Sequence, residues 1–314
     1  MKVLRGYKGA GKSLIEPVLA IGVFDGVHLG HRKVIEKMMS SSGGGDKTIL
    51  TFDPHPETVL RPHLDLPRIM SLEHRLKLFR EMGLDAAIIV KFSRHIAEMS
   101  PEDFIERVIR RGIGSERVFV GDNFYFGKGA CAGTARFRKA GTERCIKVDV
   151  VKAVKKGGKV ISSTRLRKLV SAGSLDEAEK LLGRPFSVLG TVVSGDGIGR
   201  VIGTPTANID PHHEVIPPVG VYAVKIALEG KHFPGVLNIG YKPTFYGRSP
   251  KRKEPVIEAH ILGFSGDLYG MDIEVFFVKR LRSEQHFSSK EKLRSAIEKD
   301  IETARAIMTV REQG

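Results

Sequence analysis

One change in the pattern of apolar residues, near Gly183, constrains the fold of this chain more than any other feature of its sequence. Before Gly183, short apolar runs alternate with amphipathic stretches. After it, brief runs of alternating apolar and polar residues are separated by Gly and Pro. The 314 residues exceed what one hydrophobic core usually organises. We therefore predict two domains, residues 1–184, which include a helical connector at 174–183, and residues 185–314.

The first half has the pattern of a parallel α/β sheet. Strands are expected at residues 18–23, 48–52, 86–92 and 117–123, and helices at 31–41, 72–83 and 100–112. The third helix has Ser100 as its N-cap, Pro101 in its first turn and Gly112 as its stop. This alternation predicts an α/β Rossmann-like domain, whose ligands bind at the carboxyl ends of the strands.

The second half has the pattern of a small antiparallel β-barrel. Its expected strands lie within the five segments FSVLGTVVSG, GVYAVKIALEG, FPGVLNIG, VIEAHIL and MDIEVFFVKRLR. A helix at about 288–309 closes the chain.

Charge and cysteine content limit the class of protein. The net charge of +15 resides mostly in the first half, where 34 Lys and Arg stand against 21 Asp and Glu. Such an excess suits RNA or small phosphate-rich substrates. The two cysteines, Cys131 and Cys145, form no metal-binding or disulfide pattern. With no signal peptide and no long apolar run, we expect a soluble, unprocessed, cytoplasmic protein.

A Walker A pattern at the N-terminus is rejected on its context. GYKGAGKS (6–13) fits the pattern letter for letter. That loop works between a buried strand and a helix, but here only MKVLR precedes it and Pro17 soon follows. We therefore expect Lys12 to have no part in binding ATP.

The segment GVFDGVHLGH (22–31) lies between an expected strand and an expected helix. His28 and His31, with Gly30 between them, can both face an anion that the first amides of the helix attract. The alternative is two polar residues that merely start a helix. We predict a nucleotide-phosphate site here, formed by Gly22, Phe24, Asp25, Gly26, His28, Gly30 and His31.

Two further segments carry donors suited to phosphate. Residues 162–167 supply hydroxyls and guanidinium groups just before a helix. The alternative to phosphate binding is that these residues only form an N-cap, rich in Ser and Thr, on a basic helix. The candidates are Ser162, Ser163, Thr164, Arg165 and Arg167. In the second half, glycines at 199 and 203 let backbone approach a phosphate, while Thr206 and Asn208 offer oxygen ligands to a hard cation. The candidates for ATP binding are Gly199, Arg200, Gly203, Thr206 and Asn208, the last two also as metal ligands.

These motifs resemble those of a known enzyme family. GVFDGVHLGH resembles the H-x-G-H signature of nucleotidylyltransferases, and its flanking residues resemble those of their FAD synthetase branch. Three further segments follow in the order seen in that family, TFDPHP (51–56), VGDNFYFG (120–127) and ISSTRLR (161–167). The run G-x-P-T-A-N at 203–208 resembles the signature of riboflavin kinases, and LRSEQHF (281–287) matches further along. The whole is similar to bacterial bifunctional riboflavin kinase/FAD synthetases. Departures are Thr204, where an aromatic or aliphatic residue is usual, and an irregular segment at 131–136.

The resemblance implies two ATP-dependent reactions. A C-terminal barrel would phosphorylate riboflavin to FMN with Mg²⁺, and an N-terminal nucleotidylyltransferase domain would adenylylate FMN to FAD and release pyrophosphate. Glu258, at the mouth of the barrel, would be the general base of the kinase. His28, His31 and Arg167 would stabilise charge in adenylyl transfer. Flavin would contact Phe52, His55, Pro56, Asn123 and Phe126 in the first domain, and Glu258, Arg282 and Phe287 in the second.

Two other functions would also suit part of the sequence. An adenylyltransferase with a different acceptor, such as a nicotinamide or pantetheine phosphate, would have no need of the Pro-Thr-Ala-Asn segment. An RNA-binding protein would interleave stacking aromatics with its basic residues, but the chain has no Trp and six Tyr. The expected partners are therefore riboflavin, FMN and ATP, with no nucleic acid, membrane or obligatory protein partner.

Overall fold

The computed structural model describes residues 1–63, 66–126, 133–195, 204–212, 214–241 and 255–312. The chain forms two compact units, Met1–Leu166 and Arg167–Gly314. The division falls inside helix α7 (Ser163–Ser171). Each unit is described by itself below.

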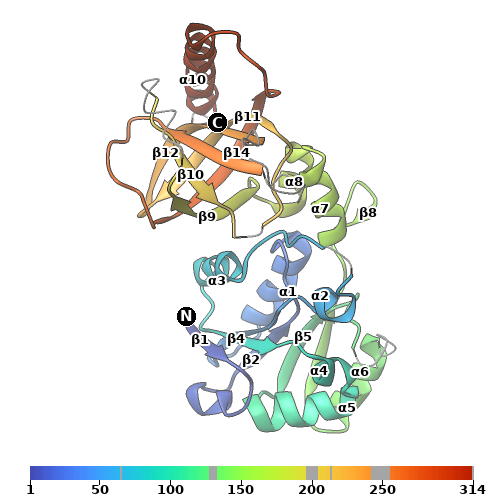
Figure 1. The fold of residues 1–314 in the computed structure, drawn as a ribbon. Coiled ribbons are helices and arrows are strands. Elements are labelled where there is room, and N and C mark those ends of the chain that lie inside the picture. Colours follow the sequence, from blue (N-terminus) through green and yellow to red (C-terminus); the bar gives the residue numbers. More distant parts are fainter. Residues whose placement is uncertain (64–65, 127–132, 196–203, 213, 242–254, 313–314) are drawn as a thin grey trace. The chain divides into compact units, whose positions relative to one another are not determined.

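The first unit is built on a six-stranded parallel sheet (Figure 1). Its strands, in spatial order, are β1 (Lys2–Arg5), β4 (Ala86–Lys91), β3 (Lys47–Asp53), β2 (Val18–Ile21), β5 (Arg117–Gly121) and β6 (Lys147–Val151). The Rossmann-like prediction is confirmed. The two outer strands, β1 and β6, were not predicted, because their residues are partly exposed and carry no continuous apolar run.

The helices of this unit follow the strands. They are α1 (Leu29–Met39), α2 (Pro56–Leu60), α3 (Leu72–Glu81), α4 (Arg94–Glu98), α5 (Pro101–Asp103) and α6 (Thr134–Thr142). A 3-10 turn, η1, spans Ala10–Ser13, and a hairpin joins β7 (Lys155–Lys156) to β8 (Lys159–Val160). Strand β1 precedes the Walker-like run, but it is a mostly exposed edge strand and not the buried strand that such a loop needs. The helix that such a loop needs is absent, since η1 is a single short turn.

The helix predicted at 100–112 differs from expectation in two ways. Ser100 caps it as predicted, accepting a hydrogen bond from the Asp103 amide, but after α5 it continues as a π-helical segment, η2 (Phe104–Ile113). Gly112 is buried within η2, and the segment ends at Gly114, whose φ of 77° is left-handed.

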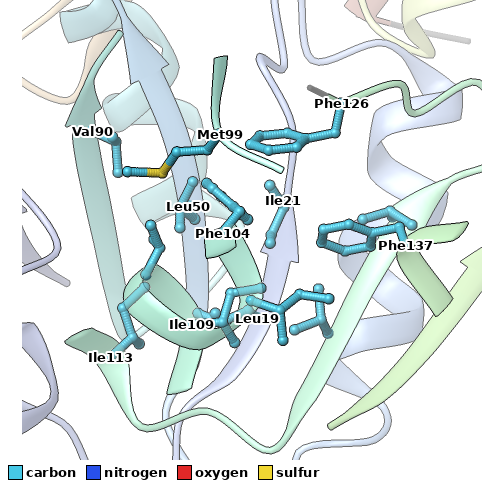
Figure 2. Packing of buried hydrophobic residues seen from close by; sticks show 14 of the residues in the cluster. Leu19, Ile21, Leu50, Val90, Met99, Phe104, Ile109, Ile113, Phe126 and Phe137 are labelled. Atoms are coloured by element: carbon cyan, nitrogen blue, oxygen red, sulfur yellow. The ribbon is translucent and has the colours of Figure 1, made fainter. Parts of the chain in front are cut away.

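The apolar side of η2 packs on the sheet. Figure 2 shows Phe104, Ile109 and Ile113 beside Leu19, Ile21 and Leu50 of the central strands, with Phe126 and Phe137 completing the cluster. The rings of Phe104 and Phe126 lie 4.3 Å apart between centroids. Burying an aromatic side chain of this kind contributes about 1.5–3 kcal/mol.

The second unit is a closed antiparallel barrel, as predicted. Its strands, in order round the barrel, are β10 (Ala207–Asp210), β13 (Pro255–Ile261), β12 (Lys231–Tyr241), β11 (Gly220–Leu228), β14 (Asp272–Arg282) and β9 (Ser187–Val193). Helix α8 (Leu175–Leu182) precedes the barrel and ends at the left-handed Gly183, and α10 (Lys290–Glu312) closes the chain.

Successive residues of the barrel strands face opposite sides. Along β13, Ile257, Ala259 and Ile261 are buried, whereas Glu258 and His260 between them are half-buried. Part of the outer face is covered by α10, where Ala304 packs in one apolar cluster with Val221, Ala223 and Val236. Helix α10 therefore partly shields the neighbouring outer surface of the barrel from water.

Candidate active sites

The first unit has a cavity of about 800 Å³ at the carboxyl ends of its strands. Segments that follow β2, β3, β5 and β6 line it, so it lies where the strand order reverses between β2 and β5. The structure brings most of the residues predicted for this domain together here. Those that line the cavity are Gly22, Phe24, His28, Gly30, His31, Phe52, His55, Pro56, Asn123 and Phe126.

His28 and His31 form a stacked pair at the start of α1. His28 is the N-cap, and its Nδ1 accepts a hydrogen bond of 3.2 Å from the His31 amide. The two rings are nearly parallel, with centroids 3.6 Å apart. A Cβ on Gly30 would lie 3.1 Å from the His28 ring, so the glycine between them leaves room for this arrangement.

Burial, followed by the nearby His28 and then by Arg75, lowers the pKa of His31 well below its ordinary value. Its Nδ1 is buried and has no hydrogen-bond partner among the described residues. Both observations describe a polar ring kept neutral without an anion. A phosphate group beside it would supply the missing partner and stabilise the protonated form.

The loop between β2 and α1 is held in an unusual backbone conformation. Phe24 and Val27 have positive φ values of 55° and 39°. The buried Asp25 carboxylate accepts hydrogen bonds from the amides of Ile69 and Met70, at 2.9 Å and 3.1 Å. Asp25 and Gly26 do not line the cavity and instead fix the loop that carries the histidines. Backbone strain of this kind persists only where the surroundings enforce it.

The segment 162–165 contacts the same loop. Ser163 Oγ donates to the Asp25 carbonyl at 2.8 Å, and Ser162 Oγ accepts from the Arg165 amide at 3.2 Å. The Arg165 guanidinium donates to the carbonyls of Lys156 and Lys159 in the β7–β8 hairpin. Thr164 is exposed in the first turn of α7. The neighbouring Ile161 lines the cavity, whereas Arg167 belongs to the second unit.

Sequence reasoning missed Arg75 of α3, whose residue surface is 2 % exposed. Its Nη1 donates to the Val23 carbonyl at 2.6 Å and to Thr51 Oγ1 at 3.0 Å, and Nη2 lies 4.0 Å from Asp53 Oδ1. Arg75 thus ties the histidine loop to the end of β3. A charged residue in an amphipathic helix usually faces water, so no local pattern marks it.

Aromatic residues form one wall of this cavity, and the predicted flavin contacts Phe52 and Phe126 are among them. Phe52 meets Phe92 edge to face, and Phe124 stacks on Phe126, with centroids 5.6 Å and 6.2 Å apart. Phe126 also packs against Phe104, so it belongs both to the cavity wall and to the core. His55 caps α2 by accepting a hydrogen bond from the Glu57 amide at 3.1 Å. Cations that sequence reasoning missed, Arg61, Arg94 and Lys152, also line this cavity.

The second unit has its own cavity of about 570 Å³, between the outer face of the barrel, α10 and the segment before it. Thr206, Glu258, Arg282 and Phe287 line it. Asn208 is 8 % exposed and does not line it. The predicted Gly199, Arg200 and Gly203 lie outside the described residues.

Glu258 lies on the outer face of the barrel, and the expectation that it stands at the barrel mouth was wrong. It is paired in register with Asn208 of β10 on one side and Asn238 of β12 on the other. Directly paired residues of antiparallel strands share a face. A Cβ on Gly195 would overlap the Asn208 amide, so this glycine packs tightly on it. The carboxylate is therefore bracketed by two carboxamides.

Arg282 is fixed by Asp300, a residue that sequence reasoning missed. Arg282 Nη2 and Nε donate to the Asp300 carboxylate at 2.8 Å and 3.1 Å, and Phe287 lies 5.5 Å from the guanidinium carbon. Asp300 is 7 % exposed. A two-pronged ion pair of this kind orients a guanidinium more strongly than a single hydrogen bond does.

The oxygen atoms of this site fit a magnesium ion bound together with a nucleotide. Thr206 and Glu258 line the cavity and carry a hydroxyl and a carboxylate, and the buried Asn208, paired in register with Glu258, carries a carboxamide. Oxygens of these kinds are ligands that Mg²⁺ prefers. Within the described ranges no group of three His, Cys, Asp or Glu side chains could hold a metal. Mg²⁺ commonly uses one or two protein ligands and completes its shell with phosphate and water.

Comparisons with known proteins agree with two functional halves. A family model described as FAD synthetase matches residues 11–165, and one described as riboflavin kinase matches residues 182–308. Proteins named bifunctional riboflavin kinase/FMN adenylyltransferase are similar along nearly the whole chain. That of Pseudomonas fluorescens is 33% identical and that of Escherichia coli K12 36% identical, covering 98% and 97% of both chains. That of Bacillus subtilis is 37% identical over 91% of both chains.

A solved structure shares the fold. The crystal structure titled macrolide-efflux protein from Streptococcus pneumoniae has a TM-score of 0.79 and 25% identity, over 97% of this chain and 99% of that one. Among the described helices of our chain, none has the length and apolar character to span a membrane.

Proposed function

The chain belongs to the family of bifunctional riboflavin kinase/FMN adenylyltransferases, and from this premise we propose that it makes FMN from riboflavin and FAD from FMN, with ATP consumed in each step. One observation supports particular residues. Each compact unit has its own cavity, and each cavity is lined by some of the residues that we propose for the matching step.

In the kinase step, Glu258 is the proposed general base. The 5′-hydroxyl oxygen of riboflavin attacks the γ-phosphorus of ATP while Glu258 accepts the hydroxyl proton. The bond from the γ-phosphorus to the bridging oxygen breaks, and ADP leaves. Mg²⁺ held by Thr206 and Asn208 together with the nucleotide would neutralise phosphate charge. Arg282, oriented by Asp300, and Phe287 then hold the flavin.

In the adenylyl transfer, the proposed nucleophile is the phosphate of FMN. One of its oxygens attacks the α-phosphorus of a second ATP, and pyrophosphate leaves. Because the nucleophile is already an anion, the protein needs no general base. His28 and His31 donate to the developing negative charge, aided by Ser163, Thr164 and Arg167, and the aromatic wall positions the isoalloxazine ring.

The finer assignments are also part of this proposal. The adenylyltransferase domain spans residues 1–184 and the kinase domain 185–314, with small molecules as the partners and the cytoplasm as the location. The compact units divide earlier, so α8, which is part of the second unit, is a connector in this scheme.

The test is incubation of the full chain with riboflavin and ATP, with Mg²⁺ or with a chelator, and separation of the flavins by chromatography. The expected result is FMN followed by FAD with Mg²⁺, and no FMN with the chelator. Unchanged riboflavin after incubation of folded protein with Mg²⁺ would contradict the proposal.

A further inference from the structure

The first unit has another cavity, of about 410 Å³, that neither proposed reaction uses. It lies between the Walker-like run and the end of η2, and we call it the basic cavity. It is lined by Tyr7, Lys8, Gly9, His95, Arg107 and Arg111, together with Met99 and Gly112. It shares no lining residue with the catalytic cavity of the same unit.

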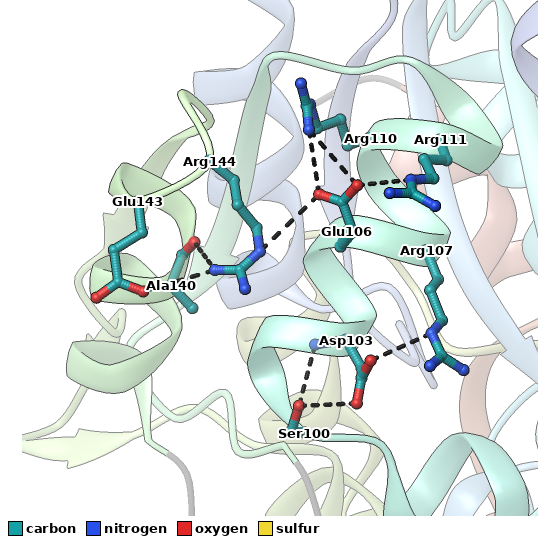
Figure 3. A network of polar contacts seen from close by, with 9 residues as sticks. All are labelled: Ser100, Asp103, Glu106, Arg107, Arg110, Arg111, Ala140, Glu143 and Arg144. Carbon is teal, nitrogen blue, oxygen red and sulfur yellow. Dashed lines mark hydrogen bonds and ion pairs between the residues drawn. The ribbon is translucent and has the colours of Figure 1, made fainter.

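Basic side chains dominate its wall. Lys8, His95, Arg107 and Arg111 line the cavity, and no Asp or Glu is among its lining residues. The shortest contact between each guanidinium group and its nearby carboxylate is made through Nε, as Figure 3 shows. Asp103 contacts Arg107 at 3.1 Å, and Glu106 contacts Arg111 at 2.6 Å. In the part of the chain that the structure describes, the terminal amino groups of both arginines and the Lys8 ammonium donate no hydrogen bond to the protein.

Two glycines bring the loop against the helix. Gly9 has a left-handed φ of 75°, which turns the chain into η1 directly after Lys8. A Cβ on Gly112 would lie 2.8 Å from the Tyr7 ring, so Tyr7 packs directly on the backbone of η2. The backbone of the loop that carries Lys8 is therefore held against η2, the helix that carries Arg107 and Arg111. The π-helical form of η2 is itself rare and is often found at functional sites.

We propose that the basic cavity binds the diphosphate or triphosphate group of a small anion, separately from both catalytic sites. Guanidinium and ammonium groups are the donors that recognise phosphate oxygens. The cavity volume falls within the range of small-ligand sites, and its concave wall suits a compact anion better than an extended polymer.

Tyrosine provides a local probe. The chain has six tyrosines, of which Tyr7 lines the basic cavity and Tyr125 lines the catalytic cavity of the same unit. In the full chain labelled with 3-fluorotyrosine, the ¹⁹F resonances of the two, assigned by Tyr→Phe variants, report on the two sites separately. Inorganic pyrophosphate and ATP are titrated in parallel, at constant ionic strength and without Mg²⁺.

The Tyr7 resonance is expected to shift saturably with pyrophosphate and with ATP. Arg107→Gln and Arg111→Gln should each weaken the response by about tenfold, because each removes a charged hydrogen-bond donor. Lys12→Gln is the matched control, since Lys12 is in the same loop but does not line the cavity. It should leave the Tyr7 response unchanged, and the Tyr125 response should be the same in all variants.

Three results would overturn the proposal. The first is a Tyr7 resonance that does not move at millimolar pyrophosphate or ATP. The second is an equal Tyr7 shift in the Arg107→Gln/Arg111→Gln double variant. The third is a response to a short RNA but not to pyrophosphate, which would make this surface a nucleic-acid contact instead.

Discussion

The imidazole of His31 stacks on that of His28 with 13° between the ring planes and 3.6 Å between their centroids. Two rings at this distance cannot both be protonated cheaply, since the positive charges would repel each other in a partly buried site. Burial and the neighbouring His28 lower the pKa of His31, so the His31 ring stays neutral until an anion beside it stabilises the protonated form. We expect binding of the triphosphate and protonation of His31 to be coupled.

The first prediction concerns the pH dependence of stability. The pKa of His31 is lowered in the folded protein, mainly by burial, whereas in the unfolded chain it is about 6.5. As pH falls below that value, the unfolded state takes up a proton that the folded state does not. The free energy of unfolding therefore decreases over the pH range between the pKa of the unfolded chain and the lower pKa of the folded protein. Urea unfolding at pH 7.5 and 5.5 should show a larger loss for the wild type than for His31→Gln. Equal losses would contradict the assignment.

The second prediction concerns catalysis by the same pair. His28→Ala and His31→Ala should each lower FAD formation from FMN about 100- to 1000-fold, because each removes a donor to the transition state. Riboflavin phosphorylation in the same preparations should stay near the wild-type rate, since both residues are in the first unit. FAD formation at an undiminished rate in both variants would sink the site assignment.

The third prediction tests the buried Arg75. Arg75→Lys keeps the positive charge, but a lysine ammonium cannot reproduce the hydrogen bonds that the planar guanidinium group donates to the Val23 carbonyl and Thr51 Oγ1. We expect kcat for adenylylation to fall about tenfold with little change in the KM for ATP, because the histidine loop loses its fixed position. Arg80→Lys, at an exposed position of α3, is the control and should behave as wild type. A change in KM with kcat intact would argue for a direct contact with substrate.

The fourth prediction separates the two chemistries at Glu258. Glu258→Gln keeps the size of the side chain and loses its basicity, so conversion of riboflavin to FMN should fall about 100- to 10,000-fold. Conversion of added FMN to FAD should remain intact. Glu302→Gln, at an exposed position of α10, is the matched control and should leave both rates unchanged. A Glu258→Gln enzyme that phosphorylates riboflavin normally would exclude Glu258 as the base.

The fifth prediction concerns the domain boundary. A fragment of residues 167–314 should fold alone and phosphorylate riboflavin with Mg²⁺, without making FAD. A fragment of residues 185–314 lacks α8, whose buried residues Leu175, Ala178, Leu181 and Leu182 belong to the second unit. It should be active but less stable, with a lower thermal midpoint. If neither soluble fragment makes FMN, the kinase site must depend on the first half.

Sequence patterns predicted the elements with continuous apolar runs and missed short strands that lack one. Strands β2, β3, β4 and β5 were found within a few residues of their bounds, while β1, β6 and β10 were missed because their residues are partly exposed and form no continuous apolar run. Gly112 was read as a helix stop, yet it lies inside η2, where its missing side chain makes room for Tyr7.

In the first unit, most of the predicted residues that line the cavity lie between a strand and the helix that follows it, where the fold itself brings them together. In the second unit, Glu258 and Arg282 lie within strands that border the cavity. The residues that were missed act across long separations in sequence. Arg75 binds Thr51 and Val23, and Asp300 binds Arg282, through contacts that no local spacing reveals. A buried guanidinium or carboxylate looks in sequence like any charged residue on an amphipathic helix.

Because burial alternates along β13, odd-numbered and even-numbered residues of this strand should respond differently to mutation. The odd-numbered Ile257, Ala259 and Ile261 fill the barrel, whereas the even-numbered Glu258 and His260 line the cavity outside it. Substitutions at the odd positions will therefore appear as lost expression or a lowered melting temperature, and those at the even positions as lost turnover in well-folded protein. The buried residues of β13 can be replaced by other aliphatic residues of equal volume without affecting catalysis. Stability and activity can therefore evolve independently within this one strand.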